Sequence, residues 1–191
     1  MLPPVPWPGI VEATVGVIWD MGGHQAPSSV PTMVAEPLVI EFQEGSRDAV
    51  VDRMATLAGS RTGWVNLTPG LDVDEPPPTR SLLSQIFGAK GPDVPLATWN
   101  PQGRPERDPF TVGIHHAQGP KVLNLLRDNG IGPPETWRRL QDHPKRGLVL
   151  AVPASTDRKD LDATVDWLLI ATGFLCPVRR TGEWRALVYG V

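Results

Sequence analysis

Apolar positions along the chain follow two spacings, one typical of β-strands and one typical of α-helices. In the N-terminal part, runs rich in β-branched and aromatic residues predict strands. After the second run, apolar residues recur at i, i+3 and i+4, which predicts a helix that begins at an N-cap, Ser46, and ends at Gly59. We therefore expect a β-β-α-β half over residues 10–68, with its strands at 10–19, 34–42 and 64–67.

Regular patterning stops over residues 69–95. This stretch is acidic and proline-rich, and its three consecutive prolines, at 76–78, favour an extended backbone and exclude a helix at that point. A short helix over 81–87 is the one regular element that the pattern allows here. The stretch is predicted to be an irregular connection between two halves of the protein.

The C-terminal half, residues 96–191, has clearer periodicity. Residues 148–152 are apolar on both faces, as expected for a central strand that is covered on both sides. Pro120 is expected at the first position of one helix and Gly130 at its end, and the second helix is expected to begin at Thr156 and stop at Gly173. Strands are predicted at 96–99, 110–116, 137–141, 148–152 and 184–189, the last after a turn at 179–182, with helices at 119–129 and 157–172.

From residue 110 onward this order is β-α-β-β-α-β, the split β-α-β or ferredoxin-like arrangement. The prediction is therefore an α+β protein with a two-layer ferredoxin-like C-terminal half. Both helices are expected on one face of the sheet, and the N-terminal half is expected to pack against the other face. The apolar runs at 38–42 and 148–152 occupy equivalent places in two β-α-β units. Either a duplication or two unrelated units explains this similarity.

Composition is typical of a single globular protein over residues 1–191. About 40% of the 191 residues are hydrophobic, which is enough for a sizeable core. The net charge of −3 gives no general attraction to nucleic acid, and the aromatic-basic strand pattern of RNA-recognition modules is absent. No apolar run reaches the roughly 20 residues that span a bilayer. We expect neither a membrane nor a nucleic-acid partner, and the single cysteine indicates a cytoplasmic protein.

The four histidines are candidate metal ligands, but their spacing argues against a metal site. His115 and His116 are adjacent on one predicted strand, so their side chains point to opposite faces. In the predicted topology, Asp142 and His143 lie at the opposite end of the sheet, about 20 Å away. We therefore expect no metal and no cofactor.

No motif of covalent catalysis or nucleotide binding is present. The sequence lacks a G-x-S-x-G elbow, a P-loop and a dinucleotide fingerprint. Cys176 precedes a proline with no histidine nearby in the sequence, and we interpret it as a small buried hydrophobic residue. The leading interpretation is a non-catalytic binding or protein-interaction domain whose partner the sequence does not identify.

The alternative is an enzyme or sensor for a small anionic metabolite, with His115 or His116 as the acid-base group. Both C-terminal helices are expected to begin at the end of the sheet where strands 110–116 and 148–152 finish. Helix N-termini present free N–H groups and positive dipole ends, which attract anions. The candidate ligand-binding residues at this edge are His115, His116, Gln118, Gly119, Ser155, Thr156 and Arg158, with Lys121 as a further cation.

Overall fold

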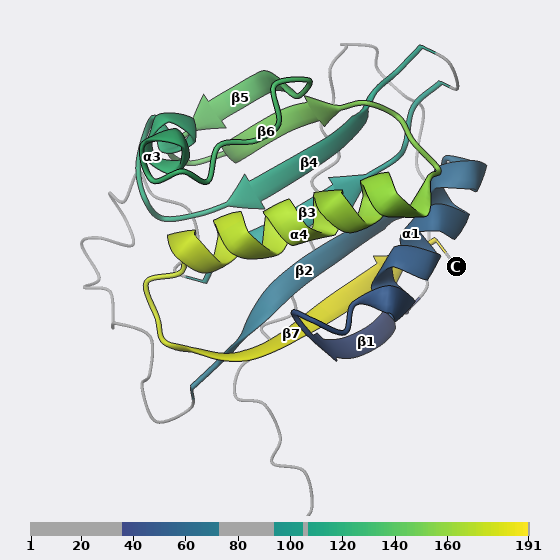
Figure 1. Ribbon diagram of the computed structural model, residues 1–191, viewed down its shortest axis with the longest axis horizontal. Helices are drawn as coiled ribbons and strands as arrows, with labels where there is room; N and C mark the ends of the chain where they lie inside the picture. Colours follow the sequence, from purple (N-terminus) through teal and green to yellow (C-terminus); the bar gives the residue numbers. More distant parts are fainter. Residues whose placement is uncertain (1–35, 73–93, 105–106, 191) are drawn as a thin grey trace, which may run out of the picture. The chain divides into compact units, whose positions relative to one another are not determined.

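The chain forms one antiparallel sheet of seven strands in the computed structural model, which describes residues 36–72, 94–104 and 107–190. The strand order across the sheet is β1-β7-β2-β3-β4-β6-β5 (Figure 1). The strands are β1 Leu38–Gln43, β2 Trp64–Leu71, β3 Leu96–Asn100, β4 Phe110–His115, β5 Arg138–His143, β6 Gly147–Val152 and β7 Arg180–Tyr189.

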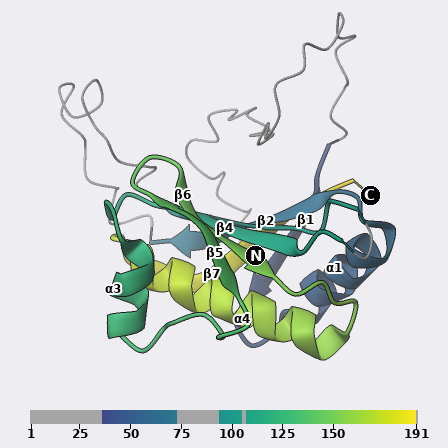
Figure 2. The ribbon, with the colours of Figure 1, turned by 90° about the horizontal axis from the view of Figure 1, so that it is seen from above.

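Three helices among the described residues cover one face of this sheet, as Figure 2 shows from above. They are α1 Asp48–Ser60, α3 Val122–Asp128 and α4 Arg158–Leu175. We call the face that they cover the front face and the opposite one the back face. The expectation of an α+β protein with the helices on one face of a sheet is confirmed.

The core lies between the front face and the helices. Along β4, buried Phe110, Val112 and Ile114 alternate with half-buried residues, which is the period of two that a sheet with one covered face requires. Trp99 packs edge-on against Phe110, with 5.4 Å between the ring centroids. α4 is the central helix and buries ten of its residues. The expected central position of residues 148–152 is confirmed, since β6 lies between β4 and β5.

The ferredoxin-like arrangement is not confirmed, because the last strand pairs elsewhere. β6 lies between β4 and β5, as that arrangement requires. The final strand should then lie beside β4, but β7 pairs instead with β1 and with β2. The hairpin of β2 and β3 fills the place beside β4. Strand patterning identified β7 but contains no information about its neighbours.

The two halves of the chain are therefore not stacked on each other. β1 and β2 of the N-terminal half belong to the same sheet as the C-terminal strands, and α1 lies on the same face as α4. The expectation that residues 10–68 pack against the other face is wrong for the part that the structure describes. The predicted strand at 10–19, the predicted helix at 81–87 and the prolines at 76–78 lie outside the described residues.

The boundaries of the helices differ from the expected ones by a few residues. α1 has Arg47, not Ser46, as its N-cap, and it continues through Gly59 to Ser60. α3 begins after Lys121, whose φ is +63°, so Pro120 is not helical. Gly130 ends α3 as expected, because its N–H and that of Ile131 bond back to the last turn. Asp157, not Thr156, caps α4.

Gly173 does not stop α4 but allows another strand to approach it. A Cβ at Gly173 would lie 2.6 Å from the Arg180 Nη1 atom. That guanidinium bonds to Glu44 at 3.0 Å and lies over the Trp184 ring. Arg180 is the first residue of β7, so the turn expected at 179–182 is wrong.

We expect Leu168→Ala and Leu150→Ala each to lower the free energy of unfolding by about 2–5 kcal/mol. Their side chains are fully buried, at 0% and 1% exposure. Urea denaturation measures the change. Ile170→Ala is the control on the same helix: Ile170 is 51% exposed, so its loss should cost less than about 1 kcal/mol. An unchanged midpoint for Leu168→Ala would contradict its place in the core.

Two helical glycines provide a matched test of the Arg180 contact. Gly59→Ala should raise the free energy of unfolding by about 0.5–1 kcal/mol, because nothing lies within 4 Å of the added Cβ. Gly173→Ala should raise the free energy of unfolding by less, because the Arg180 guanidinium must move away from Glu44 and Trp184. In an Arg180→Ala background, thermal unfolding should show the full gain for Gly173→Ala. Equal gains at both glycines in the wild-type background would contradict the contact.

Candidate functional site

The predicted site residues fall into two groups at opposite ends of β4 and β6. These strands are antiparallel, so Ile114 is opposite Leu148 and Phe110 is opposite Val152. The end of β4 is therefore about 14 Å along the sheet from the end of β6. β4 ends at His115 and is followed by His116, Gln118 and Gly119, whereas β6 is followed by Ser155, Thr156 and Arg158. The expectation that both helices begin at one edge is wrong, because antiparallel neighbours finish at opposite ends.

At the first group, a carboxylate of the protein occupies the start of α3. The two Asp142 carboxylate oxygens accept hydrogen bonds from the backbone N–H groups of Val122 and Leu123, both at 3.1 Å. These are the free helix N–H groups that an anion would use. Gln118 donates to the Leu175 carbonyl at 3.1 Å instead of pointing to a ligand. Gly119 has φ +84° and no atom near its Cβ position, so its role is conformational.

At the second group, the start of α4 is capped in the same way. The Asp157 carboxylate accepts from the N–H groups of Lys159 and Asp160, at 2.7 and 3.4 Å. Ser155 donates its hydroxyl to the Asp160 carboxylate at 2.7 Å and accepts from the Asp157 N–H. Thr156 is exposed. Negative charge at this helix end is thus already supplied by the chain.

Arg158 is used to join two helices. Its guanidinium pairs with Asp48 at 2.8 Å and with Asp52, both on α1. In the reverse direction, Arg47 at the start of α1 pairs with two aspartates of α4, Asp162 at 2.7 Å and Asp166 at 2.8 Å. The hydrogen bond from Arg47 lowers the pKa of Asp162.

Asp142 and His143 lie at the same end of the sheet as His115 and His116, not 20 Å away. β4 and β5 are both antiparallel to β6, so they run in the same direction and end together. His143 is opposite Gly147, and a Cβ on Gly147 would lie 2.9 Å from the His115 Cδ2 atom. Even so, no group of three or more potential metal ligands gathers among the residues that the structure describes.

His116 is the unusual residue of this end. It is fully buried, and neither ring nitrogen has a hydrogen-bond partner within the described ranges. Burial lowers the pKa of His116, and the neighbouring Asp142 carboxylate offsets part of that effect, while His115 adds to it. The neutral imidazole is therefore the form that the fold favours. His115, by contrast, is half-buried on the back face, as the alternation of β4 predicts.

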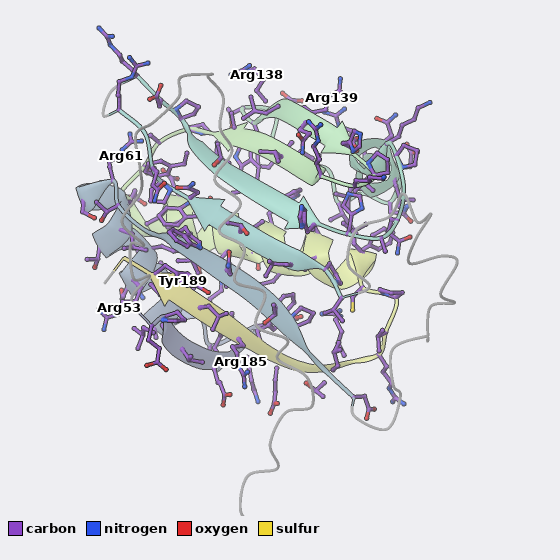
Figure 3. All side chains as sticks on the ribbon, turned by 180° about the vertical axis from the view of Figure 1, so that it is seen from behind. Arg53, Arg61, Arg138, Arg139, Arg185 and Tyr189 are labelled. Atoms are coloured by element: carbon purple, nitrogen blue, oxygen red, sulfur yellow. The ribbon has the colours of Figure 1, made fainter. Side chains whose placement is uncertain are left out.

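The residues that sequence reasoning missed lie on the back face. Trp64 and Tyr189 are cross-strand neighbours on β2 and β7, with their rings stacked 4.5 Å apart and 13° from parallel. In the next row, Val39 of β1 is opposite Leu187 of β7. Figure 3, viewed from behind, labels Tyr189 and Arg185 on this side. We call Val39, Trp64, Leu187 and Tyr189 the aromatic patch.

Two pairs of polar side chains border the aromatic patch. Thr98 donates to the Asn66 side-chain oxygen at 2.9 Å, next to Leu187. Arg185 pairs with Glu41 at 2.8 Å on the other side. The available sequence signal was the run of apolar residues at 186–189 of β7, which places apolar side chains on both faces of the sheet. Strand patterning alone did not place Trp64 beside Tyr189.

Comparisons of the chain with protein-family models, with curated protein sequences and with solved structures find no match. No helix among the described residues is long and apolar enough to span a bilayer.

Cys176 is half-buried and not fully buried as expected, and its thiol donates to the Val178 carbonyl at 3.4 Å.

We expect stability to fall with acidification through His116. Because its pKa is lowered in the fold, the unfolded chain binds more protons near its ordinary pKa of about 6.5. The stabilisation is present above about pH 6.5 and is lost as the pH falls toward the lowered pKa, by at most about 1.4 kcal/mol per pH unit. His116→Phe should remove this component in urea unfolding at several pH values, whereas the exposed control His143→Gln should retain it. An identical pH dependence in His116→Phe and wild type would refute the assignment.

Proposed function

We propose that this protein is a non-catalytic binding domain that docks a protein partner on its aromatic patch. The observation that carries the proposal is the stacked pair of Trp64 and Tyr189 beside Val39, which is 50% exposed. Tyr and Trp dominate the energetically important positions of protein interfaces, because they bury a large area at a small entropic cost. A stacked pair is also fixed before binding, which lowers the cost of association.

The surroundings of the patch favour a protein over a nucleic acid. Phosphate binding requires several free cations beside the aromatic surface. On β1 and β7, the charged residues next to Val39 and Leu187 are Glu41 and Arg185, which pair with each other. Arg138 and Arg139 lie on β5 (Figure 3), five strands from β7 and therefore about 24 Å away. A paired polar rim around an apolar centre is the usual anatomy of a protein interface.

The enzyme or sensor alternative has less support in the geometry. It requires polar groups that converge on a ligand. The two groups of candidate residues are at opposite ends of β6, and the chain's own aspartates satisfy the helix N–H groups at both ends. Anion binding by His115, His116, Gln118, Gly119, Ser155, Thr156 or Arg158 stays a prediction that no observation here tests.

Tyr189→Ala is expected to abolish retention of the partner by the immobilised protein, because it removes half of the stacked pair. The measurement is quantitative mass spectrometry of proteins retained from an extract of the source cells. Phe174→Ala is the matched control: Phe174 is an aromatic residue that is 40% exposed on α4, on the front side. Circular dichroism must show both variants folded. A partner lost with Phe174→Ala and kept with Tyr189→Ala would overturn the proposal, as would the absence of any selectively retained protein.

A further inference from the structure

The described sheet ends in two strands of different character. β5 carries a bulge between Arg139 and Gln141, and Arg138 and Arg139 are exposed on it. Bulges and charges are the devices by which proteins prevent edge strands from pairing with other chains. β1 has neither device: its six residues pair with β7 in unbroken register, and Glu41 is its one charged residue. The β5 edge is protected against strand addition, whereas the β1 edge is suited to it.

The core is incompletely closed at β1. Phe42 is buried, but Leu38 and Ile40, which also face the helices, are only half-buried. On the back face, Val39 is 50% exposed. A strand added to this edge would cover apolar side chains on both faces and would also satisfy the outward N–H and C=O groups of β1.

From these features we infer that the β1 edge pairs with the β1 edge of a second copy of this chain. A two-fold axis perpendicular to the sheet makes the two strands antiparallel and keeps the front face continuous. Residues that are opposite each other across the two β1 strands must point to the same face of the sheet. The possible registers of this pairing therefore differ in steps of two residues. Centring the axis on Glu41 would place two glutamates directly opposite each other, which is unfavourable.

Centring the axis on Ile40 gives a self-complementary register. On the front face, Leu38 is then opposite Phe42 of the second copy, which closes the core across the axis. On the back face, Val39 is opposite Glu41 of the second copy. Glu41 keeps its ion pair with Arg185 in its own chain, so no unpaired charge enters the interface. Such a dimer is a continuous sheet with an aromatic patch from each copy on one face.

The experiment changes the charge at position 39 in both directions. In the Ile40-centred register, position 39 of each copy is opposite Glu41 of the other copy. Val39→Glu therefore creates two glutamate-glutamate pairs, whereas Val39→Lys creates two lysine-glutamate pairs. Sedimentation velocity of the full chain, over about 5–500 µM, should show that the wild type dimerises. The dimer dissociation constant of Val39→Glu should be about tenfold or more above that of Val39→Lys.

Ile170→Glu and Ile170→Lys are the matched controls, because Ile170 is a similarly exposed apolar residue on α4. Both should dimerise like the wild type, and thermal unfolding should show all four variants folded. A wild type that is monomeric throughout the range overturns the proposal. Equal dissociation constants for the two Val39 variants, or a larger effect at Ile170, overturn it as well. Tyr189→Ala should leave the dimer intact, so failure here is distinct from failure of partner binding.

Discussion

The architecture depends on the insertion of β7 between β1 and β2. This strand comes from the C-terminal end of the described chain, and its neighbours come from the N-terminal part, so its hydrogen bonds join the two halves. Its front-face residues Trp184, Ala186 and Val188 are all buried in the core. The Trp184 indole donates to Glu44 at 3.1 Å, and the same carboxylate oxygen accepts from Arg180. Without β7, β1 would have no partner among the described strands.

The helix layer is held by ion pairs that run in both directions between α1 and α4. Arg47 reaches the aspartates of α4, and Arg158 reaches those of α1. The carboxylates that cap α3 and α4 are likewise the chain's own. These charges therefore contribute to the packing of the helices, and the N–H groups at the starts of α3 and α4 are bonded to Asp142 and Asp157. The residues on which the proposed function depends lie instead on the back face, where Trp64 and Tyr189 are stacked.

The two proposed interactions share Val39 but otherwise use different parts of the sheet. The aromatic patch lies on the back face of β1, β7 and β2, and the β1 edge is the strand boundary next to it. Edge pairing is a main-chain interaction that apolar side chains reinforce, whereas patch docking depends on aromatic side chains. A variant can therefore affect one interaction and leave the other unchanged.

The sequence by itself determined the elements whose cause is local. The period of two in β4, the apolar strand β6, the stripe of α4 and the Gly130 helix end all follow from neighbouring residues. Only the tertiary structure decided which strands are neighbours, because hydrogen bonds between distant strands leave no periodicity in the sequence. That pairing placed β7 beside β1, separated Ser155 from His115 and brought Asp142 to α3. It also brought the Arg180 guanidinium of β7 to Gly173, where it occupies the space that a Cβ would need.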